Sequence, residues 1–380
     1  MQEKTTRKSN FELLRIVSMF FIVLYHTIIH GHVIENSTNQ GLTMISNLLL
    51  FICIVHVNSY VLVSGYFQSK STCKQSKVWS LINANWFYRV IIVIILTSVG
   101  AISLSKVQIL KQIFVIDITD SYWFIKMYLA LYLFSPFLNK LIDQLTKNEY
   151  NKLLIILTVI LSIIPYFTGE QGFSNTGYTI QHFIYLYLIG GYLRKYPIER
   201  SYLFKRCSKQ LKQVIFITIF IICAILNYII YISSQSLNNV NSLVNDITNN
   251  LILMSRAYSN PIVIVQTIAF VLFFETLNIR SKIINNLATL TLGIYLVHDN
   301  PLMRGVLYQW LKIDNGPVSS YSFIIYIFIV SFAIYFTASL IEWIRQLIFH
   351  WIYNRKIPTK IRQKYYFWLN KVQKIDTVKS

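Results

Sequence analysis

The chain has 380 residues, of which 54% are hydrophobic and only 13% are charged, and its mean hydropathy is +0.49. This composition, with apolar runs recurring along the whole length, excludes a soluble globular domain and predicts a membrane protein. The net charge of +20 would suit nucleic-acid binding, but its distribution is explained better by membrane topology.

The first apolar run, residues 11–30, is long enough to cross the hydrocarbon core as a helix. Arg15 and His26 lie about 20° beyond three full helical turns from each other, so they share a face about 16 Å apart along the axis. An arginine there can hold a phosphate, and a deep histidine can act as a general base. The structural alternatives are an arginine that extends to lipid phosphates and a hydrogen-bonded core histidine.

Nine further apolar runs predict membrane spans, with the basic residues concentrated in alternate connections, which places both chain ends in the cytosol. The sequence therefore predicts an all-α polytopic protein of about ten transmembrane helices, a membrane domain over 1–350 and a cytosolic tail over 351–380. Basic and aromatic residues in the tail suit an anionic inner leaflet. The nine runs are roughly 44–66, 79–100, 121–141, 152–168, 178–193, 211–233, 258–277, 287–303 and 320–350.

Several of these runs contain polar residues, which are costly in a span and indicate a function by default. The second run contains His56, and the third contains Arg89 near mid-membrane, where it should face a cavity or a carboxylate. In the fourth, Lys126 follows Trp123 by about one helical turn. Trp123 is also a common interface anchor, and Lys126 can extend outward.

The ninth run is interrupted by Pro301, which cannot donate to the carbonyl of Val297. A helix break is predicted there, so that His298 and Asp299 would line a polar cavity or a kink solvated from outside. His30 lies one turn beyond His26, but no carboxylate or cysteine cluster accompanies the two in sequence. The four cysteines match no zinc motif either, and no metal site is predicted.

Four stretches together resemble acyltransferase family 3, a family of integral membrane proteins, over nearly the whole chain. They are the Arg15–His26 spacing, Ser-Gly-Tyr-Phe at 64–67, Trp-Phe to Ser-Pro-Phe-Leu-Asn at 123–139, and Gly-Ile-Tyr-Leu-Val-His at 293–298. The chain departs from the family in one place. Many members carry arginine shortly after the second stretch, whereas this chain carries Lys70, Lys74 and Lys77.

The resemblance implies transfer of an acyl group, usually acetyl, from cytosolic acetyl-CoA to a sugar hydroxyl. The acceptor would be a cell-surface or exported polysaccharide or a lipid-linked glycan. The reaction would take place at the bacterial cytoplasmic membrane. Acetyl-CoA would be a substrate, with no permanently bound cofactor and no nucleic-acid partner. Arg15 and Arg89 would bind the donor, and His26 would act as a general base or carry the acyl group covalently. The acceptor cavity would be lined by His298, Asp299, His56, Trp123 and Lys126.

The alternative function is a transporter or flippase for a glycan or lipid-linked sugar. Ten spans with polar interiors fit that class too. It predicts no acyl donor, and it does not require Arg15 and His26 to share a face.

Overall fold

The computed structural model describes residues 8–114, 122–169, 172, 174–202, 204–237, 242–313 and 318–356. These residues form helices and no β-sheet, which confirms the predicted all-α class. The helices are α1 (Ser9–His30), α2 (Gln40–Cys53), α3 (His56–Gln68), α4 (Gln75–Ser98), α5 (Lys106–Phe114), α6 (Trp123–Gln144), α7 (Lys147–Thr158), α8 (Ile164–Thr168), α9 (Ile180–Lys195), α10 (Lys209–Leu237), α11 (Ser242–Ser255), α12 (Pro261–Thr276), α13 (Lys282–Leu287), α14 (Thr291–His298), α15 (Pro301–Trp310) and α16 (Ser322–Lys356).

Six helical segments of the described chain are long and apolar enough to cross a membrane: Ser9–His30, Gln40–Gln68, Gln75–Ser98, Lys147–Thr168, Lys209–Leu237 and Ser322–Trp351. The other four predicted spans coincide with α6, α9, α12 and the pair α14 and α15. The chain is thus a membrane protein, while the number ten and the orientation of the termini stay predictions. Most of the predicted tail, residues 357–380, lies outside the described residues.

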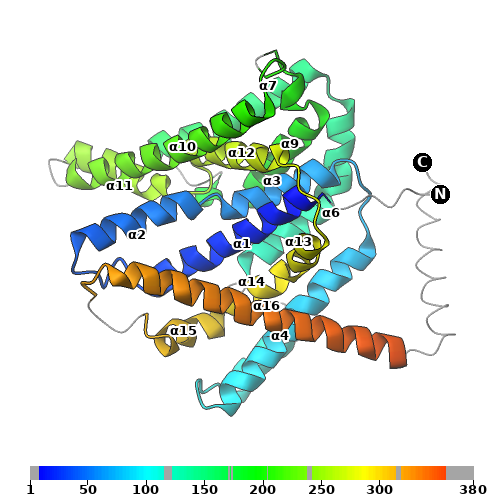
Figure 1. The fold of residues 1–380 in the computed structure, drawn as a ribbon, viewed down its shortest axis with the longest axis vertical. Coiled ribbons are helices and arrows are strands. Elements are labelled where there is room, and N and C mark those ends of the chain that lie inside the picture. The colour runs from blue at the N-terminus through cyan, green and yellow to red at the C-terminus, as the bar shows by residue number, and fades with distance from the viewer. Residues whose placement is uncertain are drawn as a thin grey trace.

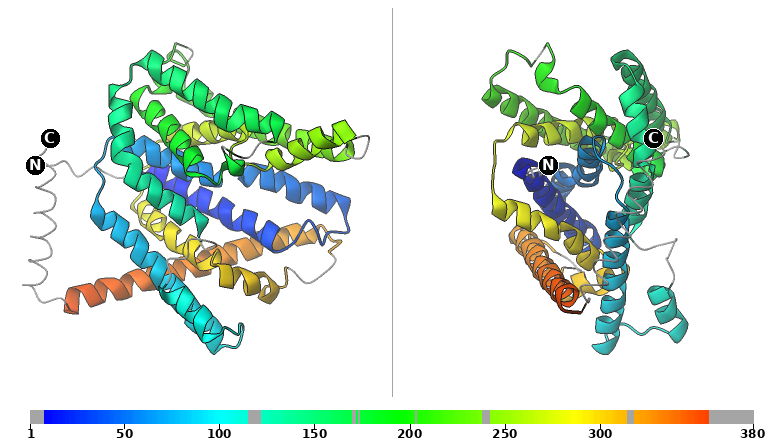
Figure 2. Two further views of the ribbon diagram at one scale, coloured as in Figure 1. Left: turned by 180° about the vertical axis from the view of Figure 1, so that it is seen from behind. Right: turned by 90° about the vertical axis from the view of Figure 1, so that its right-hand side faces the viewer.

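Helix α1 lies in the middle of the bundle (Figure 1) and contacts α2, α3, α12, α13, α14, α15 and α16. It joins two hydrophobic cores. Its first turns, with Phe11 and Leu14, belong to the core around α3, α9 and α12. From Met19 onward it belongs to the core that includes α14 and α16. Figure 2 shows α1 between these two groups of helices from both further directions. The α1 face shared by Arg15 and His26 therefore lies inside the bundle.

Two helices of the bundle begin at the same dipeptide, Asn-Pro. At Asn260-Pro261 and at Asn300-Pro301 the asparagine side chain accepts hydrogen bonds from the first backbone N–H groups, and the proline occupies the first helical position. Proline suits that position because its missing N–H would have no partner inside the helix. Helix α14 ends at His298 and α15 begins at Pro301, so the predicted break is confirmed.

The Ser-Pro-Phe-Leu-Asn stretch of α6 has a structural role. Pro136 cannot donate to the carbonyl of Tyr132, and the hydroxyl of Ser135 donates to that carbonyl instead, at 2.7 Å. Asn139 donates to the carbonyls of Gln68 and Ser71 and accepts from the hydroxyl of Tyr187. The stretch therefore ties α6 to α9 and to the end of α3.

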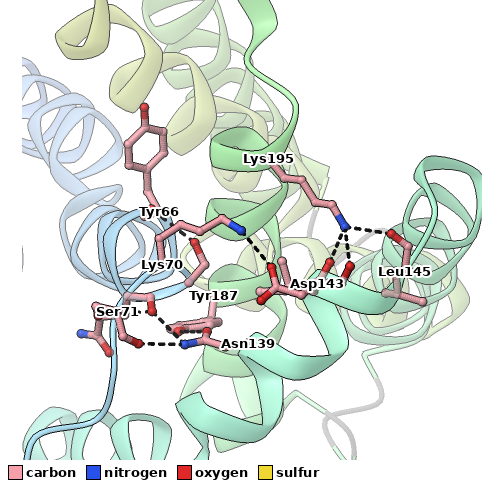
Figure 3. A network of polar contacts seen from close by, with 11 residues as sticks. Tyr66, Lys70, Ser71, Asn139, Asp143, Leu145, Tyr187 and Lys195 are labelled. Atoms are coloured by element: carbon pink, nitrogen blue, oxygen red, sulfur yellow. Dashed lines mark hydrogen bonds and ion pairs between the residues drawn. The ribbon is translucent and has the colours of Figure 1, made fainter.

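Two lysines reinforce the same end of the bundle (Figure 3). The Lys195 ammonium donates to the carbonyls of Ile142, Asp143 and Leu145 at the end of α6. Lysine suits this position because the last carbonyls of a helix lack partners and carry a partial negative charge. The Lys70 ammonium lies 2.8 Å from the Asp143 carboxylate on the surface.

Gly65 of the Ser-Gly-Tyr-Phe stretch permits the closest helix contact of this region. A Cβ atom there would overlap the backbone of Tyr187 on α9. Gly190 on α9 meets the backbone of α3 in the same way, at Leu62. Small residues allow such close approach of membrane helices, so this stretch has a packing role.

We therefore expect Gly65→Ala to separate α3 from α9 and to destabilise the protein by roughly 1–3 kcal/mol, as overpacking does. Gly305→Ala is the matched control, because a Cβ at that helical position would meet no atom within 4 Å. Thermal unfolding of both variants in detergent, followed by size-exclusion chromatography, measures the difference. Equal unfolding temperatures for the two variants would contradict the packing role of Gly65.

The predicted topology can be tested along a single helix. Ser208 directly precedes α10 and Ser236 lies near its end, and both are exposed. With about 1.5 Å of rise per residue, the two positions are roughly 40 Å apart, enough to lie on opposite sides of a membrane. In a background without the four native cysteines, Ser236→Cys should react with an impermeant maleimide in intact cells, whereas Ser208→Cys should react only after permeabilisation. The reverse labelling would contradict cytosolic termini.

Candidate active site

A cavity of about 470 Å³ runs along the inward face of α1. Its wall includes Arg15, Met19, Ile22, His26 and Ile29, which recur every three or four residues and so lie on one helix face. Arg15 and His26 thus line the same cavity, as the predicted shared face requires. Its volume falls in the range of small-molecule sites. The remaining wall comes from α3, α4, α6, α14, α15 and the residues before α9 and α12.

The Arg15 end of the cavity contains two cations. Arg15 donates to both oxygens of the Glu12 carboxylate, at 3.0 and 3.1 Å, and its side chain is about one-third exposed. Lys77, in the first turn of α4, is the second cation of the wall. Of the three lysines that follow the Ser-Gly-Tyr-Phe stretch, Lys77 alone is part of the cavity wall.

Hydroxyl groups surround this end as well. Tyr60 donates to the backbone carbonyl of Arg15, and Ser64 and Gln68 donate to the hydroxyl of Tyr128. Tyr60, Ser64 and Tyr128 all line the cavity. The Arg15 end is therefore positively charged and polar.

His26 lies farther along the cavity, where the break between α14 and α15 approaches α1. Its Nδ1 atom is 3.2 Å from Nε2 of His298 and 3.4 Å from Oδ1 of Asp299. His298 is buried, and its Nδ1 lies 2.6 Å from the carbonyl oxygen of Ile294. The guanidinium of Arg304 is 3.4 Å from the same Asp299 oxygen. The structure thus brings His26, His298 and Asp299 together, although His298 touches His26 rather than lining the cavity.

The break itself is fixed by Asn300 and Tyr122. Asn300 caps α15 through its side-chain oxygen, and its amide donates to the hydroxyl of Tyr122 at 2.8 Å. The Tyr122 hydroxyl donates in turn to the carbonyl of Leu296 in α14. All three residues next to the break, His298, Asp299 and Asn300, are buried. The position of Asp299 is therefore set by hydrogen bonds on both of its sides.

His26, His30 and Asp299 also form a group whose candidate ligand atoms lie within 4.8 Å of one another. Such a group can hold a cation. Here, however, the carboxylate faces the Arg304 guanidinium, whose positive charge opposes a second cation, and Nδ1 of His26 is in hydrogen-bond contact with His298. We therefore interpret the group as a cluster of polar side chains and not as a metal site.

Aromatic rings from α6 and from the residues before α9 and α12 form another part of the wall (here called the aromatic wall: Trp123, Tyr178 and Tyr258). The ring of Trp123 lies 4.3 Å from that of Tyr178 and stacks on that of Tyr258 at 6.0 Å, measured between centroids. His56 lines the cavity beside this wall, with its Nδ1 2.6 Å from the carbonyl oxygen of Cys53 and its Nε2 3.2 Å from the Tyr258 hydroxyl. His56 and Trp123 thus lie at the site, as predicted.

Besides His298, two predicted site residues lie outside the cavity wall. Arg89 is buried on α4, where it donates to the Gln112 side chain at 3.4 Å. Lys126 is half-buried on α6. Arg89 was predicted to face a cavity or a carboxylate, and Lys126 to line the acceptor cavity or extend outward. Neighbouring helices also accommodate such groups, and the sequence does not distinguish these cases.

Sequence reasoning assigned no site role to Arg304, Lys77, Tyr178 or Tyr258. Arg304 directly follows the predicted span 287–303, where a charged residue is usually interpreted as a topology signal. Lys77 carried a usable signal, since it was one of three lysines in a region where related proteins carry arginine. The tyrosines gave none, because tyrosine is common throughout this chain and in membrane interfaces generally.

A protein-family model described as an acyltransferase domain matches residues 8–343, which include every residue of the cavity wall. None of the curated proteins and none of the solved structures matches the chain.

Proposed function

Because the chain belongs to acyltransferase family 3, we propose that this membrane acyltransferase moves an acetyl group from cytosolic acetyl-CoA to a hydroxyl of a cell-surface or exported polysaccharide. One observation carries the proposal: a single cavity connects the two cations, Arg15 and Lys77, with His26. A transporter would not need this connection. An enzyme that takes a phosphorylated donor from one side of the membrane requires it.

The Arg15 end suits the phosphates of coenzyme A. Phosphate oxygens are bound well by guanidinium and ammonium groups, and arginine can donate two parallel hydrogen bonds. Beyond these cations the wall is largely apolar on α1, with Met19 and Ile22. An extended pantetheine arm in this part would bring its thioester to His26, about 16 Å farther along α1.

The His26 end suits a sugar acceptor. The aromatic wall presents ring faces whose partial negative charge attracts the C–H groups of a sugar ring. The acceptor hydroxyl would attack the thioester carbonyl while His26 takes its proton. Collapse of the tetrahedral intermediate would then release the thiolate of coenzyme A, which recovers that proton from His26. The products are an acetyl ester and free coenzyme A.

The donor site can be tested with Lys77, since Arg15→Ala would also leave the buried Glu12 carboxylate without its partner. Lys77→Ala should raise the KM for acetyl-CoA by roughly 10–100-fold, as loss of a hydrogen bond to a charged group does. Acetyl-pantetheine lacks the adenosine phosphates, so its KM should change little. Arg15→Lys keeps the charge next to Glu12 but loses the paired hydrogen bonds, and should show a smaller effect of the same kind.

Lys70→Ala is the control, because its ammonium pairs with Asp143 on the surface, where both side chains are about half exposed. Kinetics are measured in membranes matched for protein level. If Lys77→Ala affected acetyl-CoA and acetyl-pantetheine equally, Lys77 would not bind phosphate.

His26 separates the enzyme from the alternatives. As a general base it should contribute roughly 10²–10⁴-fold to the rate, so His26→Ala should nearly abolish acetyl transfer. His26→Gln keeps some hydrogen bonding but cannot accept a proton at neutral pH, and should be almost as inactive. The assay is donor-dependent acetylation of glycan with radiolabelled acetyl-CoA, at equal amounts of membrane protein.

Near-normal activity of His26→Gln would defeat the role as base, and no donor-dependent acetylation by the unmodified protein would favour the transporter. Withholding the acceptor distinguishes transfer through a covalent acyl-histidine from direct transfer with His26 as general base. A covalent acyl-histidine would accumulate label on the protein. Direct transfer would leave the protein unlabelled.

A further inference from the structure

The hydrogen bonds around His298 determine which of its ring nitrogens carries a proton. Its Nδ1 lies 2.6 Å from the carbonyl oxygen of Ile294. A carbonyl oxygen only accepts, so Nδ1 of His298 must be the donor. In the neutral ring the other nitrogen, Nε2, then has a free lone pair and can only accept.

The same reasoning extends to His26. Its Nδ1 lies 3.2 Å from that Nε2 of His298. Two lone pairs do not form a hydrogen bond, so Nδ1 of His26 must carry a proton and donate it. Nε2 of the neutral His26 ring is then unprotonated, and His26 lines the cavity. The state of His26 is therefore set by the carbonyl of Ile294, relayed through His298.

We infer that His298 is a positioning residue that holds His26 in the Nδ1-protonated tautomer and so makes Nε2 the nitrogen that accepts the proton. The inference rests on the proposed function for its catalytic consequence, but the tautomer itself does not depend on that function. Second-sphere partners fix histidine tautomers in this way in other enzymes and in metal sites.

Asp299 and Arg304 complete the arrangement. When Nε2 of His26 takes a proton, the ring becomes a cation whose Nδ1–H remains on the side of His298 and Asp299. The Asp299 oxygen at 3.4 Å from Nδ1 offers a negative charge to this cation, and the guanidinium of Arg304 lies 3.4 Å from the same oxygen. His30 faces the same ring, 5.0 Å away between ring centroids, and adds no negative charge.

Two substitutions of His298 separate positioning from packing. Asparagine places its amide where Nδ1 of the histidine lies, so His298→Asn keeps the hydrogen bond to Ile294 but loses the contact with His26. Glutamine reaches the place of Nε2, so His298→Gln presents its amide oxygen to Nδ1–H of His26. If the role of His298 is only its hydrogen bond to Ile294, His298→Asn should be the better tolerated variant. If its role is to position His26, His298→Gln should be the better tolerated variant.

We expect His298→Asn to lower kcat at least roughly 100-fold with the KM for acetyl-CoA nearly unchanged, since a base in the wrong tautomer is severely impaired. His298→Gln should retain most of the activity. Both are measured in membranes at equal protein level. Equal kcat values for the two variants, or a higher value for His298→Asn, would overturn the inference.

A direct measurement needs no substrate. With ¹⁵N-labelled histidine, nuclear magnetic resonance of the full chain in nanodiscs distinguishes Nδ1–H from Nε2–H rings, and the His26 signal is identified by its loss in His26→Gln. The unmodified protein and His298→Gln should show Nδ1–H for His26, and His298→Asn should show a smaller fraction of that ring, because only the Asp299 oxygen at 3.4 Å then faces Nδ1. An Nε2–H ring in the unmodified protein would overturn the inference. If the unmodified protein showed the Nδ1–H ring of His26 but transferred no acetyl group, the inference about the tautomer would be upheld. The proposed function would then be defeated.

Discussion

The contact between His26 and His298 connects segments 272 residues apart in the chain, and the geometry of the cavity depends on it. An unpaired polar group costs free energy in an apolar environment, and this contact gives a partner to Nδ1 of His26 and to Nε2 of His298. Helix α1 supplies one ring and α14 the other. His298 is the last residue of α14, and the Asn300 cap and Pro301 begin α15 shortly after it.

The four stretches that resemble the family divide into two kinds of role. Ser-Gly-Tyr-Phe and the Ser-Pro-Phe-Leu-Asn end of the third stretch mainly hold α3, α6 and α9 together, through the close approach at Gly65 and the hydrogen bonds of Asn139. Trp123, at the start of the third stretch, lines the cavity. The Arg15–His26 pair and the end of Gly-Ile-Tyr-Leu-Val-His face the chemistry. The last stretch does both, because a Cβ at Gly293 would overlap Glu342 of α16, while His298 reaches His26.

A second buried cluster supports the same region from the side of α16. Glu342 is 2% exposed and accepts hydrogen bonds from Tyr88 of α4 and from Arg345, the latter through two contacts of 2.7 Å. A buried carboxylate needs such partners, because an unpaired charge there would be costly. The cluster fastens α4 and α16 where α14 begins to approach α1.

The sequence by itself determined the all-α membrane class, the face shared by Arg15 and His26, and the break at Pro301. Each follows from local physics: the length of an apolar run, the helical repeat, and the missing donor of proline. Only the tertiary structure decided that Lys77 and Arg304 join the site while Arg89 and Lys126 lie outside its wall. It also decided that His298 contacts His26 directly. These outcomes depend on how helices distant in sequence rotate and pack, and a polar residue in a span can be satisfied by any neighbour that packing brings to it.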